Sequence, residues 1–508
     1  MKNSAASPRS EWKPRFWEGA AVVSGLCGLA AFAVWWFYSR GYILYYGDAQ
    51  AHLNISRSII DSRTPGYEQI GSVWLPLLHV ICLPWVGSTW LWSTGLAGSI
   101  PVSVCFVIAG TSFYFAAKDA YKSRIAALVV LCCFALNPNI LYLSAIPMTE
   151  IVFVAGVAVT LLCLLRFKDT QHKGWIALGV LASWAMSLTR YDGWFLIPFA
   201  AIWFASFARS RRGSLLIAFG LLASLAPLYW CAHCWWETGN ALDFYNGPYS
   251  AKAIQGGKPY PGYHDWRIAL LYYAKAGQLC SGWGLTLLGI AGVAYALATR
   301  IVSKLGFLCL TPLFYIWSLH SSGNPIFVPQ LYPHGYYNSR YGIAVVALAA
   351  FAAGALVLPL AAKYRKLALI VPLLSVLPWL LHPGVENWIC WKESQVNSVA
   401  RRAWTQAAAS YLHASYSRGQ GILAPFGDLT GIFCKSGIPL SEVLHEGGGA
   451  AWAANTTRPD LIHQESLAIV QAGSTLSGKI ENNASVYRLI YRFEEPGAPA
   501  LQIFKRTQ

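Results

Sequence analysis

The sequence predicts a polytopic α-helical membrane protein with a soluble α/β domain at its C-terminal end. Of the 508 residues, 56% are hydrophobic and only 12% are charged, against about 25% charged residues in an average soluble protein. Long apolar runs recur as far as residue 382, and the composition becomes more polar after residue 384. These observations predict about eleven transmembrane helices followed by one folded domain.

The predicted spans are apolar runs separated by short polar loops, and several are shorter than the ~20 residues that a straight crossing needs. They cover residues 17–38, 90–116, 125–143, 150–166, 175–190, 193–208, 214–233, 279–299, 305–320, 341–361 and 367–382. The first run is too long for a plain signal peptide and has no cleavage site, so we interpret it as an anchor. The apolar segment 73–86 is short and contains Pro76 and Pro84. We interpret it as interfacial or re-entrant, because a full crossing would place the basic loop 118–124 outside.

The net charge of +16 is concentrated in short loops between the apolar runs. Such loops stay on the cytoplasmic side, and they predict a cytoplasmic N-terminus at 1–16. The membrane domain then covers 17–383, with external loops at 39–72, 234–278 and 320–340, and the soluble domain 384–508 is also external. This pattern explains the charge without nucleic acid, and we expect no nucleic-acid partner. The many tryptophans and the short loops suggest a bacterial inner membrane, and the external side would then be periplasmic.

The soluble domain is predicted to contain a helix at 398–417, an apolar run at 421–426 and strands at 467–471, 486–493 and 501–505. Its length is close to that of a usual compact domain. Most of the 12 cysteines lie in apolar runs and read as core residues. Cys390 and Cys434 lie in the external region, and a disulfide between them stays open at this stage.

Asp48 is the first candidate for chemistry. It follows the first span by about ten residues, in a loop that also carries His52 and Arg57. A carboxylate at the membrane surface can act as a base on a substrate that arrives from the lipid. The sequence Gly-Asp-Ala-Gln is also typical of a helix start, so a capping role for Asp48 stays open.

Two further acidic positions follow breaks between spans. Glu150 begins the span after the Asn-Pro motif at 137–138, where first-turn helix chemistry is the alternative. Arg190 and Asp192 stand in a tight turn between two apolar runs, which favours a structural or supporting role.

Arg340 stands at the external start of a late span and is followed by Tyr341. A guanidinium binds phosphate oxygens bidentately, so Arg340 is the best-placed cation for a lipid phosphate. Snorkelling toward the interface is the alternative. His334, Lys252, His264 and Arg57 are weaker phosphate or substrate candidates.

In order along the chain, these motifs resemble the GT-C superfamily of membrane glycosyltransferases. More narrowly, they are similar to its protein mannosyltransferase and aminoarabinose-transferase branch (family 39-like). The resemblance rests on Asp48 after the first span, Trp74-Leu75-Pro76-Leu77, the stretch 137–150, the break 190–193 and Arg340-Tyr341. The chain has Gly-Asp-Ala where that branch commonly has an Asp-Glu pair, and Glu150 where many relatives have aspartate.

The resemblance implies an inverting transfer of a sugar from a polyprenyl-phosphate donor to a hydroxyl of a lipid, glycan or protein. Asp48 and Glu150 would be the catalytic pair, and Arg340, His334 and Lys252 would bind the donor phosphate. His52, Arg57, Arg190, Asp192, His264 and Tyr341 would bind substrate or support these groups. A divalent metal ion stays open as a cofactor. The alternatives from other classes are a transporter or lipid flippase, and a non-catalytic scaffold for envelope polysaccharide assembly.

Overall fold

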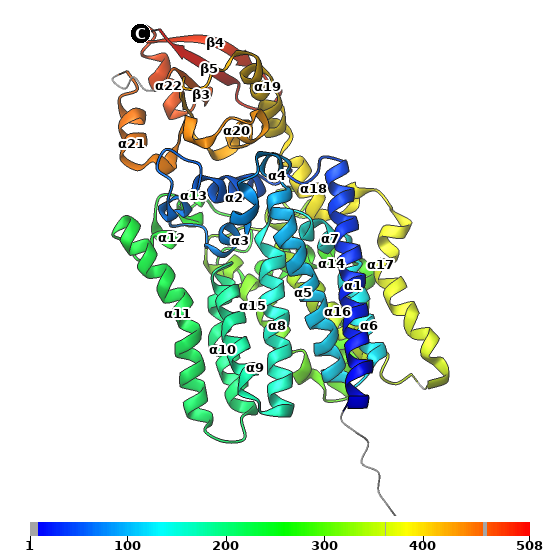
Figure 1. Ribbon diagram of the computed structural model, residues 1–508. Coiled ribbons are helices and arrows are strands. Elements are labelled where there is room, and N and C mark those ends of the chain that lie inside the picture. The colour runs from blue at the N-terminus through cyan, green and yellow to red at the C-terminus, as the bar shows by residue number, and fades with distance from the viewer. Residues whose placement is uncertain (1–8, 361, 461–464, 508) are drawn as a thin grey trace, which may run out of the picture.

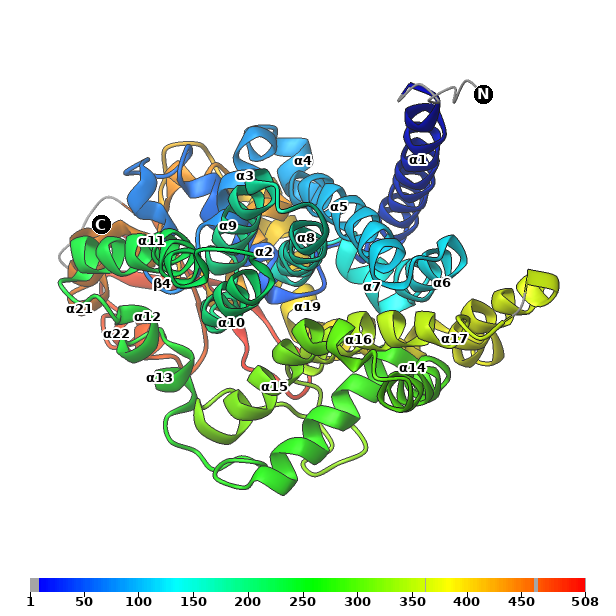
Figure 2. The same ribbon diagram turned by 90° about the horizontal axis from the view of Figure 1, so that it is seen from below.

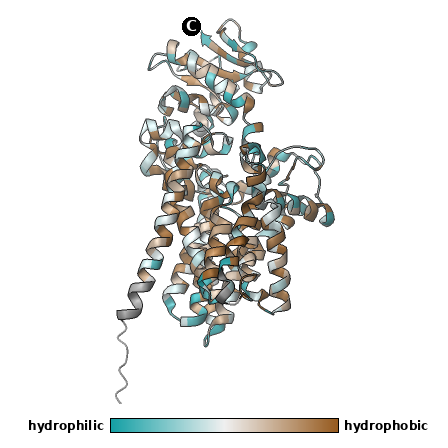
Figure 3. Ribbon diagram, turned by 90° about the vertical axis from the view of Figure 1, so that its right-hand side faces the viewer, coloured by the Kyte–Doolittle hydropathy of each residue, from teal (hydrophilic) through white to brown (hydrophobic). Residues whose placement is uncertain are grey.

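The computed structural model describes residues 9–360, 362–460 and 465–507. Apolar helices stand side by side in a bundle, and the C-terminal domain sits on one end of it (Figure 1). The bundle is predominantly hydrophobic along its length, whereas the C-terminal domain alternates between polar and apolar residues (Figure 3). Residues 1–8 of the predicted cytoplasmic segment 1–16 lie outside the described residues.

The helices of the bundle and its external layer follow one another along the chain. They are α1 (Arg9–Ser39), α2 (Gly47–Ser58), α3 (Leu77–Val86), α4 (Thr89–Thr94), α5 (Leu96–Tyr121), α6 (Arg124–Ala135), α7 (Pro138–Ser144), α8 (Thr149–Thr170), α9 (Lys173–Ser187), α10 (Asp192–Phe207), α11 (Arg212–Thr238), α12 (Asp243–Asn246), α13 (Ala251–Gln255), α14 (Trp266–Ala298), α15 (Gly306–Ser321), α16 (Ile343–Ala355) and α17 (Ile370–Leu381). One-turn 3₁₀ segments join several of them, among them η3 (Ser339–Gly342). Seen from below, α1 stands at the rim of the bundle beside α5 (Figure 2).

Helices occupy each of the predicted spans, but the predicted count of eleven crossings is not confirmed. Within the described residues, five helices are long and apolar enough to cross a membrane alone. A sixth crossing results if α6 and α7, which meet at a bend of 67°, form one broken span. The others are too short, as α17 with 12 residues shows. α3 has 10 residues, which gives a length of about 15 Å against a hydrocarbon core of about 30 Å, as expected for an interfacial segment.

Basic side chains form ion pairs at the end of the bundle away from the soluble domain. At the end away from the soluble domain, Glu18 pairs with Lys118 and Arg124, while Lys122 pairs with Asp169 in the last turn of α8. These contacts join the lower end of α1 to α5 and to the start of α6, and the end of α5 to the end of α8. Asp48, by contrast, lies on α2 at the end that carries the soluble domain (Figure 1).

Small residues let α14 approach its neighbours closely, as in many membrane helix pairs. A Cβ atom on Gly292 would lie 2.2 Å from the carbonyl oxygen of Ala352 on α16. A Cβ atom on Gly342, at the start of α16, would lie 2.4 Å from the carbonyl oxygen of Ala276 on α14. The backbone that carries residue 340 is therefore held directly against α14.

The C-terminal domain contains a five-stranded sheet in the order β2-β1-β3-β5-β4. The strands are β1 (Ile422–Leu423), β2 (Val443–Leu444), β3 (Leu467–Gln471), β4 (Tyr487–Phe493) and β5 (Leu501–Arg506), and the helices are α18 (Ile389–Val396), α19 (Val399–Ser415), α20 (Gly431–Ser436), α21 (Gly449–Thr457) and α22 (Thr475–Glu481). β1 pairs in parallel with β2 and β3, while β5 runs antiparallel to β3 and β4. The structure thus has strands at all three predicted strand positions and a helix at 398–417. α18 differs from the rest of this region because it packs on α7 and η3 of the bundle.

The structure has no disulfide between Cys390 and Cys434, a pairing that the sequence leaves open. All twelve cysteines are free, and these two lie in different packing environments. The Cys434 thiol donates to the carbonyl oxygen of Trp92 at 3.3 Å, whereas the Cys390 sulfur lies 4.0 Å from the sulfur of Cys280. Position outside the membrane did not predict proximity, because α18 inserts into the bundle end while α20 belongs to the soluble domain.

Candidate active site

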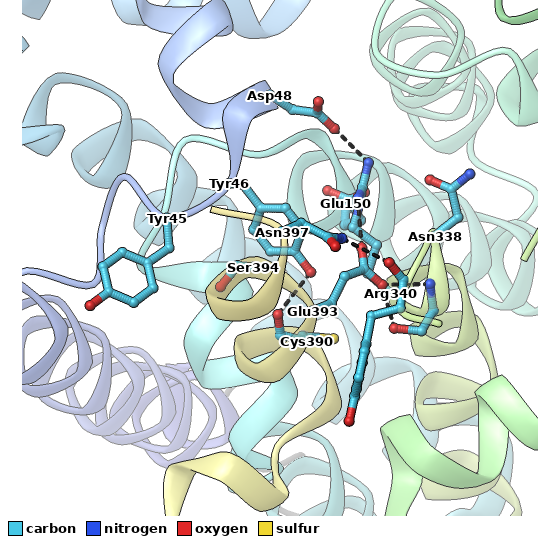
Figure 4. A network of polar contacts seen from close by, with 12 residues as sticks. Tyr45, Tyr46, Asp48, Glu150, Asn338, Arg340, Cys390, Glu393, Ser394 and Asn397 are labelled. Carbon is cyan, nitrogen blue, oxygen red and sulfur yellow. Dashed lines mark hydrogen bonds and ion pairs between the residues drawn. The ribbon is translucent and has the colours of Figure 1, made fainter. Parts of the chain in front are cut away.

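Arg340 is the centre of a polar network at the external end of the bundle (Figure 4). Its Nη2 donates to Asp48 Oδ2 at 2.6 Å, its Nε to Glu150 Oε1 at 2.9 Å and its Nη1 to Glu393 Oε1 at 2.8 Å. One guanidinium thus joins three carboxylates from α2, α8 and α18. We call these four residues the Arg340 cluster.

The three carboxylates differ sharply in exposure. Asp48 is 40% exposed, whereas Glu150 is 3% and Glu393 1% exposed. Tyr46 takes the N-cap position of α2, and Asp48 lies in the first turn, so the carboxylate is directed to Arg340 rather than used as the cap residue. Asp48 is therefore the member of the cluster that a substrate can reach.

A second arginine extends the cluster toward α10. Arg190 Nη1 donates to the same Glu150 oxygen at 3.2 Å, and its Nε donates to Asp192 Oδ2 at 3.2 Å. Arg190 also lies over the ring of Tyr341, with 4.7 Å between the guanidinium carbon and the ring centroid. Four carboxylates thus surround two guanidinium groups, and the formal charge of the six side chains is −2 when all are ionised.

Glu393 is the member that sequence reasoning missed. Its Oε2 accepts from the backbone N–H of Ser339 at 2.7 Å and from the Ser339 hydroxyl. The carboxylate therefore fixes the 3₁₀ turn that carries Arg340 as well as the guanidinium itself. The signal in the sequence was weak: one acid in an aromatic stretch that reads as the beginning of a soluble domain.

The Asn-Pro motif at 137–138 anchors α18 beneath the cluster. The side-chain amides of Asn137 and Asn139 each donate to the carbonyl oxygen of Cys280 at 3.0 Å. Asn139 Oδ1 also accepts from the backbone N–H of Cys390 at 3.0 Å. These contacts connect α7, α14 and α18, so the motif supports the position of Glu393 rather than contacting a substrate.

A narrow, mostly apolar cavity begins at Glu150 and Arg190 and continues between α8, α15 and α16. Its wall includes Val157, Leu308 and Ala347, deeper along these helices. The second carboxylate oxygen of Glu150 is buried and has no hydrogen-bond partner among the described residues. A buried oxygen of this kind calls for a partner that the protein alone does not supply.

His52 lies one turn after Asp48 on α2 and is buried. Its Nδ1 lies 2.9 Å from Nε2 of His79, and its ring packs on Trp74 at a centroid distance of 4.4 Å. Burial, together with the positive charges of Arg340 and Arg190, lowers the pKa of His52 to about 3. His52 is thus a neutral hydrogen-bonding group near the cluster and not a cation.

The remaining predicted site residues lie outside the Arg340 cluster. Arg57 pairs with Asp61 at 2.8 Å and donates to two backbone oxygens at the end of α3. Lys252 on α13 lies over the ring of Tyr245. His264 packs against Tyr263, and His334 bonds to the carbonyl oxygen of Pro329. None of these contacts reaches a residue of the Arg340 cluster.

Metal binding was left open by the sequence. The described residues include no group of three or more His, Cys, Asp and Glu side chains arranged to hold a metal ion. In the Arg340 cluster, one oxygen of each carboxylate is directed to a guanidinium instead. The residues present do not fit a metal site, and we derive no step through one.

Comparisons with known proteins agree with this architecture. The family model described as dolichyl-phosphate-mannose-protein mannosyltransferase matches residues 85–236. Among solved structures, ArnT from Cupriavidus metallidurans bound to undecaprenyl phosphate is similar, with a TM-score of 0.57, 12% identity, and coverage of 93% of this chain and 97% of that one. The same protein in its apo state gives a TM-score of 0.55, 13% identity and 98% coverage of both chains. A search of curated proteins gives no match. The resemblance predicted from the motifs is confirmed, and the chain has the fold of the GT-C glycosyltransferases.

Proposed function

We propose that this protein is an inverting glycosyltransferase that moves a sugar from a polyprenyl-phosphate donor to a hydroxyl acceptor. The observation that carries the proposal is the Arg340 cluster: a partly exposed carboxylate, Asp48, is bound to a guanidinium, and Glu150 of the same cluster lines an apolar cavity. Such a site offers a base, a cation for a leaving phosphate and an apolar surface for a lipid chain.

The polarity of the cavity supports a position for the donor. The polyprenyl chain would lie along α8, α15 and α16, where the walls are apolar. Its phosphate would then meet Arg190 and Arg340 at the upper end. Undecaprenyl phosphate in the ArnT structure supports a lipid of this class.

In this proposal, donor binding and base activation are one event. All three nitrogens of the Arg340 guanidinium are occupied by carboxylates. Nη1 and Nη2 each keep one further N–H, and a phosphate oxygen that takes the Nη2 position replaces Asp48, the exposed partner. Once replaced at Nη2, Asp48 is free to accept a proton.

Bond formation and cleavage then balance in a single displacement. The acceptor oxygen attacks the anomeric carbon while its proton passes to Asp48, which must lie within hydrogen-bond reach. The bond between the anomeric carbon and the phosphate oxygen breaks, and its electron pair leaves with the phosphate. Arg340 and Arg190 stabilise the charge that develops there. Glu150 holds both arginines in place through one oxygen.

We further propose that this site faces the periplasm of a bacterial inner membrane. The basic loops gather at the opposite end of the bundle, as the positive-inside rule requires of the cytoplasmic face. The acceptor would approach between the bundle end and the soluble domain. His52 would hydrogen-bond to substrate as a neutral group.

The test is sugar release from a panel of radiolabelled polyprenyl-phosphate sugars by the full chain in lipid. We expect wild type to turn over at least one donor and Asp48→Asn to be at least about 100-fold slower, as for loss of a general base. Asp61→Asn is the matched control, because Asp61 also pairs with an arginine in the same external region. Full turnover by Asp48→Asn would reject Asp48 as the base. Absence of turnover with every donor and acceptor class would favour the transporter or scaffold interpretation.

The replacement step makes its own prediction. Asp48→Asn removes the carboxylate that competes for Arg340 Nη2, so this variant should bind polyprenyl phosphate more tightly than wild type although it does not turn over. Equilibrium binding of a fluorescent polyprenyl phosphate measures this. Weaker binding by the variant would show that Asp48 helps to hold the phosphate and is not replaced by it.

A further inference from the structure

A second, larger cavity lies where the soluble domain meets the external layer of the bundle. It encloses about 1530 Å³, including its open mouth. Its wall combines the segment after α1, α2 and α4 with α19 and α20 of the soluble domain. None of the residues of the Arg340 cluster lines it, and the ring of Tyr45, which does, points away from that cluster (Figure 4). We call this space the junction chamber.

Two buried oxygens in the chamber wall lack partners. Gln50 on α2 is 7% exposed and Thr405 on α19 is 8% exposed, and both line the chamber. Within the described residues, neither Gln50 Oε1 nor Thr405 Oγ1 has a hydrogen-bond partner. Gly431 leaves the room that Gln50 occupies, because a Cβ atom there would lie 2.7 Å from its amide nitrogen. Buried oxygens are rarely left unpaired, so these two indicate a polar ligand.

The charge of the chamber favours an anion. Arg402 and Lys435 line it, and in the part of the chain that the structure describes neither forms an ion pair with a carboxylate. Arg402 donates to Ser398 Oγ at 3.0 Å and to the hydroxyl of Tyr45 at 3.2 Å, which fixes its guanidinium at the wall. Glu495 is the single acid of the lining, so the formal charge of the chamber is +1.

One wall of the chamber lies at the level where α1 ends. Tyr38, in the last turn of α1, lines the chamber and lies 6.5 Å from Trp90 on α4. Both rings are exposed. Exposed Tyr and Trp rings at the end of a membrane helix mark the headgroup level of the bilayer. Ile43 and Leu44 add apolar wall at this position. A ligand can therefore enter from the leaflet with its apolar part still in lipid.

From this geometry we propose that the junction chamber binds the phosphate-bearing headgroup of a membrane lipid. Arg402 and Lys435 bind the phosphate, while Gln50 and Thr405 hydrogen-bond to headgroup hydroxyls. The site is separate from the donor site and does not depend on the proposed transferase activity.

The experiment is native mass spectrometry of the full chain with phosphatidylglycerol or with phosphatidylcholine of the same acyl chains. Wild type should retain phosphatidylglycerol at least about tenfold more than the Arg402→Gln/Lys435→Gln double variant, because two charge-assisted contacts are lost. Lys258→Gln/Arg267→Gln is the charge-matched control, since both side chains are exposed at the same end and outside the chamber. Ala403→Trp, which fills the chamber without changing its charge, should lower retention as the double variant does.

Equal retention of phosphatidylglycerol by wild type and both chamber variants would overturn the proposal, as would equal retention of the two lipids by wild type. Competition separates the two sources of phosphate. Inorganic phosphate at the same concentration should leave lipid retention unchanged. Displacement of the lipid by inorganic phosphate alone would reject a lipid site in favour of a simple anion site.

Discussion

Replacement of Glu393 by glutamine tests whether α18 is part of the site. Glu393 is 1% exposed and accepts three hydrogen bonds, two from Ser339 and one from Arg340. Glutamine keeps the shape and one oxygen but presents an amide N–H₂ on its other side. If the oxygen stays with Ser339, the amide donor faces the donor of Arg340, and both lose their acceptor.

The magnitude follows from that arrangement. Loss of a hydrogen bond to a charged partner costs about 1.5–3 kcal/mol, and a buried donor left without an acceptor adds about 1–3 kcal/mol. We expect Glu393→Gln to lower the free energy of unfolding by about 2.5–6 kcal/mol and to slow sugar release at least tenfold.

Thermal unfolding in detergent and donor turnover in lipid measure the two effects. Glu442→Gln is the matched control, since Glu442 also accepts from a hydroxyl and a backbone N–H, of Tyr416 and Gly419, but lies away from the cluster. The control should unfold earlier without loss of turnover per folded protein. Wild-type stability and turnover in Glu393→Gln would refute the role assigned to α18.

Three other outcomes are expected. Burial lowers the pKa of His52 from 6.5 to about 3. Its contribution to the free energy of unfolding is therefore complete above pH 6.5 and falls as the pH drops toward 3, with a loss of about 2 kcal/mol at pH 5. His52→Gln should make acid unfolding less steep. Gly284→Leu should prevent α14 from packing on α17, since even a Cβ would lie 2.1 Å from the Leu374 carbonyl oxygen, and folded yield in membranes measures this. Reducing agent should leave the melting temperature unchanged, because Cys390 and Cys434 are both free, and a lower melting temperature would contradict that assignment.

The sequence predicts the helices better than it predicts which of them cross a membrane. Hydropathy locates apolar runs, and helices occur at all of the predicted spans. Whether a helix crosses the membrane depends on its length and on its bends, and neither can be predicted from local composition. Gly95, with a φ of 85°, separates α4 from α5 inside one predicted span, and α6 and α7 meet at 67° inside another.

The sequence likewise predicts some features of the candidate site and not others. Asp48, Glu150 and Arg340 stand beside span ends, and span ends on one side of a bundle converge, so their proximity could be predicted from topology. Their direct ion pairs could not. His264 and His334 were selected because histidine can bind phosphate, but the path of a long loop depends on tertiary contacts. Glu393 was missed because the sequence of α18 predicts the beginning of the soluble domain and not a part of the membrane domain.

The net negative charge of the site weakens its binding of the lipid phosphate that the reaction releases. Asp48, Glu150, Glu393 and Asp192 outnumber Arg190 and Arg340 by two formal charges. A polyprenyl-phosphate sugar is a phosphodiester with one negative charge, whereas the released polyprenyl phosphate is a monoester with a second ionisation near pH 6. Surplus carboxylates therefore oppose the product more than the donor, because like charges in a partly buried site repel strongly. Under the proposed function, the same acids that hold Arg340 in place would promote release of the spent lipid. A site with Arg340 and fewer acids would bind donor phosphate more strongly but would also retain its product.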